Sequence, residues 1–345
     1  MVTRRRPESR VRKLHGFPIA VCGGTCETGP TKSPAGSTIV QPSFLLPCLM
    51  PEKLSKSLST LTIQQAGALM VLKADWRLHA LSDNLATMLG AEQELEPGDD
   101  LADRLGRQFA HDSRGWAQGL DANSGMVRYL RHEGEAGILD LSITQVGERY
   151  VVSFEPARPG KTIARDALVQ RFLHKLRPLS DVSAIAEGAA MQIRMFTQSD
   201  HVAIVLTDGE HGGQVLAQSG AEAFTLASSA TSFRQLLPGV DDPGSAGMIV
   251  DTQDAGWLVR TADNEDPDIE LQHSPLRQPK ASTVVALGEQ GARGALWFPL
   301  LGATGPVGLV LCRRATPRHC DAARRAATDL AVSYLALMIQ AHRQG

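Results

Sequence analysis

This chain of 345 residues carries little net charge and no long apolar run. Lys and Arg total 35 and Asp and Glu total 37, so the formal net charge is -2 at pH 7. Without an excess of positive charge, the chain lacks the electrostatic signature of a protein that binds nucleic acid or an anionic membrane. No apolar run reaches the length that spans a bilayer. We therefore expect neither nucleic acid nor a membrane as a partner.

Cysteine is scarce and catalytic signatures are missing. The five cysteines are Cys22, Cys26, Cys48, Cys312 and Cys320, an odd number that argues against a disulfide framework and favours a reducing cytoplasm. Cys22 and Cys26 lack a second ligand pair at zinc-finger spacing. The sequence shows no Ser-His-Asp ordering, paired metal motif or kinase signature. It thus predicts a cytoplasmic protein that is not an enzyme and has no metal site.

What the chain does contain is enough apolar sequence, 43%, for the cores of two ordinary domains. Residues 1–49 differ from the rest, because a basic start is followed mostly by Gly, Pro, Ser and Thr. Such a composition cannot bury much apolar surface. We expect this leader either to be disordered or to be a mis-assigned extension, with translation starting at Met50 instead of Met1.

Residues 63–156 read as an α+β unit. The run Ala68–Leu72 suits a buried strand, and residues 139–143 alternate between apolar and polar as a half-buried strand does. Residues 150–154 are expected to pair back on that strand as a hairpin. Asp83 is a candidate cap for a short helix that Gly90 ends.

After a linker at residues 158–160, helices and strands follow one another. A helix is expected from about residue 163 to 176, and Ser180 is a candidate cap for the next one. A final helix is expected from about residue 317 to 342. Strand patterns occupy residues 202–206, 215–217, 295–300 and 307–312.

Four segments carry a resemblance to a known family. They are Ile63-Gln64-Gln65-Ala66-Gly67-Ala68-Leu69, Pro238-Gly239-Val240-Asp241-Asp242-Pro243, His273-Ser274-Pro275-Leu276-Arg277, and Val307-Gly308-Leu309-Val310-Leu311-Cys312-Arg313-Arg314. In this order they resemble the PAS and GAF domains of bacterial phytochromes. The resemblance implies an α+β fold of two domains. A PAS domain with its preceding segment would occupy residues 50–157, an antiparallel sheet with short helices. A GAF domain with its terminal helix would occupy residues 163–345, an antiparallel sheet flanked by helices.

In phytochromes the GAF pocket holds a linear tetrapyrrole, and the resemblance assigns four positions of this chain to that pocket. Asp241 falls on the aspartate beside the pyrrole nitrogens. Arg277 falls on the arginine that binds a propionate, a task for which guanidinium donors are well matched. His273 and Ser274 match the residues just before it. These four residues are the candidate cofactor-binding residues, inherited from a bilin site and either used or vestigial.

Other pocket positions depart from the family. Thr283 and Ala286 replace a histidine and a tyrosine, and Ala295 and Trp297 replace two serines. If the indole faces the pocket it occupies part of the volume, which a close-packed site does not absorb freely. Arg313 replaces a histidine. At the attachment position of plant members stands Ser282, which lacks a thiolate, and Cys312 is expected to pack in the core.

Two functions follow from the resemblance. The first is a phytochrome-like sensory module that binds biliverdin weakly and without a covalent bond, or no cofactor at all, and signals to a separate protein. The second is a pigment-free PAS-GAF module for dimerisation or protein interaction. The resemblance also implies that residues 50–62 reach the GAF domain through a loop that includes residues 259–269. A homodimer is expected from an apolar stripe on the last helix. Its members are Ala323, Ala327, Leu330, Tyr334, Leu337 and Met338.

Overall fold

The computed structural model describes residues 61–122, 127–134, 137–157, 165–207, 213–222, 236, 246–261, 271–303 and 305–344. The chain divides into two units, Met1–Lys56 and Ser57–Gly345, and every described residue belongs to the second. The expectations for residues 1–49, for the start at Met50 and for Asp241 therefore lie outside the described residues, and so do Cys22, Cys26 and Cys48. The architecture of the described part is α+β with antiparallel sheets, as predicted.

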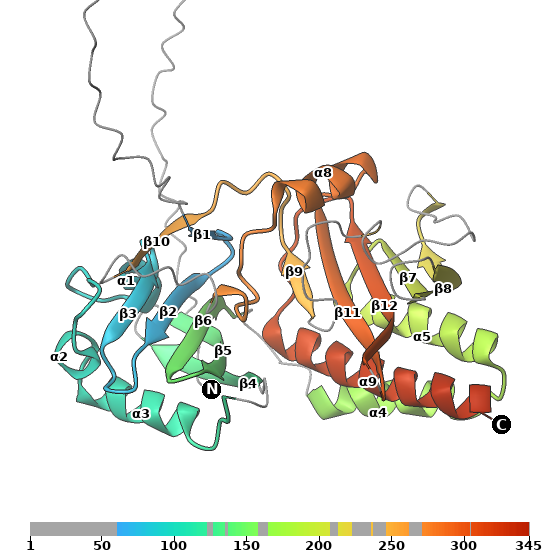
Figure 1. The fold of residues 1–345 in the computed structure, drawn as a ribbon, viewed down its shortest axis with the longest axis horizontal. Coiled ribbons are helices and arrows are strands. Elements are labelled where there is room, and N and C mark those ends of the chain that lie inside the picture. The colour runs from blue at the N-terminus through green and yellow to red at the C-terminus, as the bar shows by residue number, and fades with distance from the viewer. Residues whose placement is uncertain are drawn as a thin grey trace, which may run out of the picture. The chain divides into compact units, whose positions relative to one another are not determined.

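The first sheet has seven antiparallel strands in the order β1-β10-β3-β2-β6-β5-β4 (Figure 1). Its strands are β1 (Thr62–Ile63), β2 (Ala68–Leu72), β3 (Leu78–Ser82), β4 (Val127–Gly134), β5 (Gly137–Val146), β6 (Arg149–Pro156) and β10 (Trp257–Thr261). Three helices accompany it: α1 (Leu85–Leu89), α2 (Leu101–Leu105) and α3 (Arg107–Ala117). The predicted hairpin is present as β5 and β6, whereas β4 was not anticipated.

Both faces of the central strands of the first sheet are buried. One face packs on α1, α2 and α3 through a cluster that includes Met70, Leu141 and Phe154. The other face contributes Leu69 and Val71 to a second cluster that extends into the rest of the chain. This explains why all five residues of β2 are buried and why its sequence is uniformly apolar.

Strand β10 enters this sheet from a distant part of the chain. It pairs with β1 on one side and with β3 on the other. The turn before it needs Gly256, whose φ is +77° and where a Cβ would lie 3.0 Å from the Ile63 carbonyl oxygen. An ion pair between Arg260 Nε and Asp83 Oδ1, at 2.8 Å, ties β10 to the end of β3. Asp83 was predicted to cap α1, but Asn84 stands at that position and Asp83 binds Arg260 instead. Within the loop expected at residues 259–269, residues 259–261 therefore belong to a strand, and residues 262–270 lie outside the described part.

The second sheet has five antiparallel strands in the order β8-β7-β12-β11-β9 (Figure 1). Its strands are β7 (His201–Thr207), β8 (Gly213–Gly220), β9 (Gly247–Ile249), β11 (Gly294–Gly302) and β12 (Gly305–Arg314). The helices are α4 (Arg165–Leu176), α5 (Val182–Thr197), α8 (Ala281–Glu289) and α9 (Ala322–Gln344). One face of the sheet packs on α4, α5 and α9, and the other packs on α8.

Two helix starts differ from the prediction. Helix α5 is capped by Asp181, whose Oδ2 accepts from the Ala184 amide at 3.0 Å, and not by Ser180. Helix α9 begins at Ala322, five residues after the predicted start at Pro317. There Asp321 Oδ1 accepts from the Arg324 amide at 2.9 Å, as a cap does. The residues just before α9 are thereby free to make tertiary contacts.

Candidate functional site

The predicted site residues that the structure describes lie in the segment that leads into α8. Ser274 is 6% exposed, and its Oγ lies 2.8 Å from the Oγ of Ser153 on β6. Arg277 is half-buried, forms a bridge with Ile63 and accepts a hydrogen bond on its carbonyl from Gln64 Nε2 at 2.9 Å. His273 is exposed. The structure thus brings Ser274 and Arg277 against the first sheet.

Trp297 lies on the face of the second sheet that packs on α8. It borders the cluster formed there by Ala295, Leu287 and their neighbours. Its register partner on β9 is Gly247, where an added Cβ would lie 1.9 Å from Cζ2 of the indole. The indole therefore lies directly across the backbone of β9, and only a glycine leaves room for it. Trp297 therefore packs on β9, on the face of the second sheet that α8 covers.

Arg313 is buried at the end of β12, only 1% exposed. It donates from Nη1 to Gln290 Oε1 at 3.0 Å, and its Nη2 lies 3.2 Å from His201 Nδ1. Burial and the neighbouring Arg313 and Arg194 lower the pKa of His201 to about 4, despite a hydrogen bond with Gln218 that raises it. His201 is thus neutral at pH 7, and Nδ1 is an acceptor for the guanidinium. Burial lowers the pKa of Arg313 to about 10, so this side chain stays charged.

Neither described thiol is poised for covalent chemistry. Cys312 is buried in the core, as predicted, and burial raises its pKa to about 12. Burial also raises the pKa of Cys320. Because the thiolate is the nucleophile, both thiols are inert at neutral pH in the folded protein.

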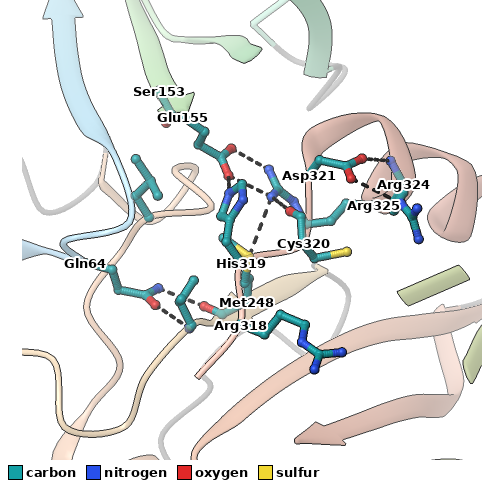
Figure 2. Close-up of polar contacts among 12 residues, drawn as sticks. Gln64, Ser153, Glu155, Met248, Arg318, His319, Cys320, Asp321, Arg324 and Arg325 are labelled. Carbon is teal, nitrogen blue, oxygen red and sulfur yellow. Dashed lines mark hydrogen bonds and ion pairs between the residues drawn. The ribbon is translucent and has the colours of Figure 1, made fainter. Parts of the chain in front are cut away.

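The most highly charged buried contact joins the first sheet to the last helix (Figure 2). Glu155 on β6 is 0% exposed, and Arg325 in the first turn of α9 is 6% exposed. Arg325 donates from Nη1 to Oε2 at 2.7 Å and from Nη2 to Oε1 at 2.5 Å. His319, just before α9, approaches Oε2 at 2.5 Å. We call Glu155, His319 and Arg325 the carboxylate joint.

The electrostatics of the joint favour its charged form. Burial alone would raise the pKa of Glu155, but the charge of Arg325 and the hydrogen bonds from His319 and Arg325 lower it to about 2. Burial likewise opposes the charge on Arg325, yet Glu155 raises the pKa of that guanidinium. The pKa of Tyr129, a residue of β4 in the same field, is raised mainly by burial. Glu155 and Arg325 are therefore a desolvated ion pair at all physiological pH values.

Gln64 adds a second connection beside the joint (Figure 2). Its Nε2 donates to the carbonyls of Met248 at 2.8 Å and Arg277 at 2.9 Å. Its Oε1 accepts from the Val250 amide at 2.8 Å. The side chain is 0% exposed, so it satisfies backbone groups that water does not reach. One residue next to β1 thereby holds β9 and the segment before α8.

Sequence reasoning missed the carboxylate joint. A local signal existed, because Glu155 lies on β6 just after the largely apolar residues 151–154, and Arg325 lies between pairs of alanines in α9. Nothing local pairs them, since they are 170 positions apart. The joint contains no nucleophile, and no group of three His, Cys, Asp or Glu suited to a metal occurs among the described residues. What the arrangement can do is transmit displacement of β6 to α9.

Comparison with known proteins identifies the first part of the chain. A family model described as PAS fold matches residues 58–157. This range contains β1 to β6 and α1 to α3, so the match supports a PAS domain built from the first sheet and its helices, to which β10 is added from outside the matched range. PAS domains suggest a sensory or signalling role. A comparison with curated proteins found no match. None of the described helices is long and apolar enough to cross a membrane.

Proposed function

We propose that this protein is a phytochrome-like sensory module whose tetrapyrrole pocket has degenerated. The PAS domain at residues 58–157 supports a sensory role. Residues 163–345 would be its GAF domain, a proposal supported by an antiparallel sheet with α8 on one face and α4, α5 and α9 on the other. The protein would have no catalytic activity of its own and would act through a separate cytoplasmic signalling protein.

The contact between Trp297 and Gly247 carries the part of the proposal that concerns the pigment. An indole packed on β9 takes volume that a bilin ring would need, and overpacking a formed site costs about 1–3 kcal/mol. A charge-assisted bond from Arg277 to a propionate would contribute roughly 1.5–3 kcal/mol. Because these terms nearly cancel and no described thiol is reactive, biliverdin would bind weakly and without a covalent bond.

The carboxylate joint supplies a route for the signal. A change in the PAS domain that moves β6 would act on Arg325 directly, because the bidentate bond leaves little freedom between the two residues. Arg325 lies at the start of α9, whose far end exposes apolar side chains. This route requires no pigment.

Helix α9 is the proposed surface for dimerisation. The stripe predicted there divides in two, since Ala327 is 0% exposed within the core whereas Tyr334 is 39% and Leu337 61% exposed. The exposed part supports a homodimer. Light scattering at tens of micromolar should give twice the monomer mass, and Leu337→Glu should halve it. A wild-type protein of monomer mass would refute this part of the proposal.

A pigment-free interaction module is the alternative function, and the same contact of Trp297 favours it. The experiment that separates the two is titration with biliverdin, read by visible absorption. Trp297→Ser should tighten binding by about fivefold to a hundredfold, since relief of overpacking is worth about 1–3 kcal/mol. Arg277→Ala should weaken whatever binding remains.

Trp257→Ser is the matched control, because Trp257 is 37% exposed and belongs to β10 of the first sheet. It should leave the affinity unchanged. Pigment that stays attached to the wild-type protein through denaturation would contradict the proposed weak binding. A protein that remains colourless both as wild type and as Trp297→Ser would favour the interaction module.

A further inference from the structure

A separate cavity lies at one end of the second sheet, where five elements stop or start. Helix α5 ends at Thr197, β7 begins at His201, β8 ends at Gly220, α8 ends at Glu289 and β12 ends at Arg314. Between them is an open cavity of about 620 Å³. Its polar lining consists of Arg194, Ser199, Asp200, Gln290 and Thr316, and the remaining lining residues are alanine or glycine.

Two opposite charges line this cavity without pairing. Arg194 belongs to the last turn of α5, and its Nε is buried without a hydrogen-bond partner. Asp200 accepts from the Ala315 amide on Oδ2 at 2.8 Å, and no described side chain binds its other oxygen. Within the described part of the chain, neither residue forms an ion pair, although both face the same space. Both charges are therefore available to a ligand that enters the cavity.

The wall behind the cavity strengthens its positive side. Gln290 lines the cavity and also accepts from the buried Arg313, which places a second guanidinium just behind the lining. His201 contributes no charge at pH 7, because burial and these arginines lower its pKa to about 4. The cavity is therefore lined by one guanidinium and one carboxylate, with a second guanidinium behind Gln290.

From this arrangement we infer that the cavity binds a small zwitterion of the α-amino acid class. The ligand carboxylate would bind Arg194, and the ligand ammonium would bind the open oxygen of Asp200. The hydroxyls of Ser199 and Thr316 offer further donors and acceptors, and the alanine and glycine lining leaves room for a small side chain. One ligand would thus neutralise both unpaired charges. The inference does not depend on the tetrapyrrole proposal, because none of these residues belongs to that pocket.

The experiment is a thermal-shift screen of the full-length protein with the twenty standard amino acids, followed by calorimetric titration of those that shift the midpoint. At least one amino acid should raise the midpoint saturably, since a ligand of the folded state stabilises it by mass action. Acetate and methylammonium, each with one of the two charges, should not. Arg194→Gln and Asp200→Asn should each weaken binding about tenfold or more, because each removes a charge-assisted bond.

Two controls keep the test independent of folding. Asp200→Asn retains an acceptor for the Ala315 amide, and Arg194→Lys retains the charge and should bind with intermediate affinity. Arg171→Gln alters an exposed arginine of α4 and should bind as the wild type does. The inference is overturned if no amino acid raises the midpoint, or if Arg194→Gln and Asp200→Asn both bind as tightly as the wild type. It is also overturned if acetate binds as well as the best amino acid, which would indicate a plain anion site.

Discussion

Removal of the cation from the carboxylate joint should destabilise the protein strongly. In Arg325→Leu the carboxylate of Glu155 stays buried without its main partner. Breaking a buried pair in this way costs about 3–5 kcal/mol. The pKa of Glu155 gives a similar figure, because a decrease from 4.5 to about 2 corresponds to about 3 kcal/mol of stabilisation at neutral pH. We expect urea denaturation of Arg325→Leu to show a loss of this order in the free energy of unfolding.

A double variant and a surface control complete this test. Glu155→Leu combined with Arg325→Leu should be more stable than Arg325→Leu alone, because no uncompensated charge remains. Arg293→Leu removes the partner of Asp251 in a pair whose side chains are 35% and 26% exposed, and it should cost no more than about 1 kcal/mol. If Arg325→Leu costs no more than Arg293→Leu, the joint is not desolvated and our reasoning is wrong.

The pH dependence gives an independent check on the same pair. The pKa of Glu155 is depressed in the folded state, so its contribution to stability is complete above pH 4.5 and is lost as the pH falls towards about 2. The difference in unfolding free energy between wild type and Glu155→Gln should therefore be largest at neutral pH and shrink over this window. A difference that is constant from pH 7 to pH 2.5 would contradict the depressed pKa.

Two further predictions concern neighbouring contacts. Gln64→Leu should lower the free energy of unfolding by about 3 kcal/mol or more. Three backbone groups lose their partner, and each buried unsatisfied group costs about 1–3 kcal/mol. A loss below about 1 kcal/mol in urea denaturation would mean that water replaces the side-chain amide. Gly247→Ala should destabilise the wild type, because the new methyl group meets the indole of Trp297. In a Trp297→Ala background the same change should be nearly neutral, and an equal cost in both backgrounds would show that the clash is with something else.

Local sequence patterns were sufficient for several strands of the first sheet. The alternation in β5 predicted a half-buried strand, and this was wrong, because residues 139–144 are all buried, the polar Asp140, Ser142 and Thr144 included. The uniformly apolar run of β2 did report its burial, since burial follows from the side chains themselves. Cys312 could be placed in the core for the same reason. Strand β4 was missed because its residues are mostly exposed or half-buried and so show no clear period.

Contacts between distant segments could not be predicted from such patterns. Residues 259–261 were assigned to a polar loop from the sequence, and they belong to β10 because β1 and β3 offer hydrogen bonds on both sides of that strand. Glu155 and Arg325 tolerate burial only because each compensates the other. The cavity between Arg194 and Asp200 likewise depends on how the ends of five elements meet.

The sequence by itself therefore determined the α+β class and several strands of the first sheet, because these depend on residue type and local period. Tertiary structure decided the rest. It set the face on which Trp297 lies, the strand that completes the first sheet and the charged pair that links β6 to α9. Each of these is a contact between residues far apart in the chain. Such a contact contributes to stability only after the fold has brought both partners together.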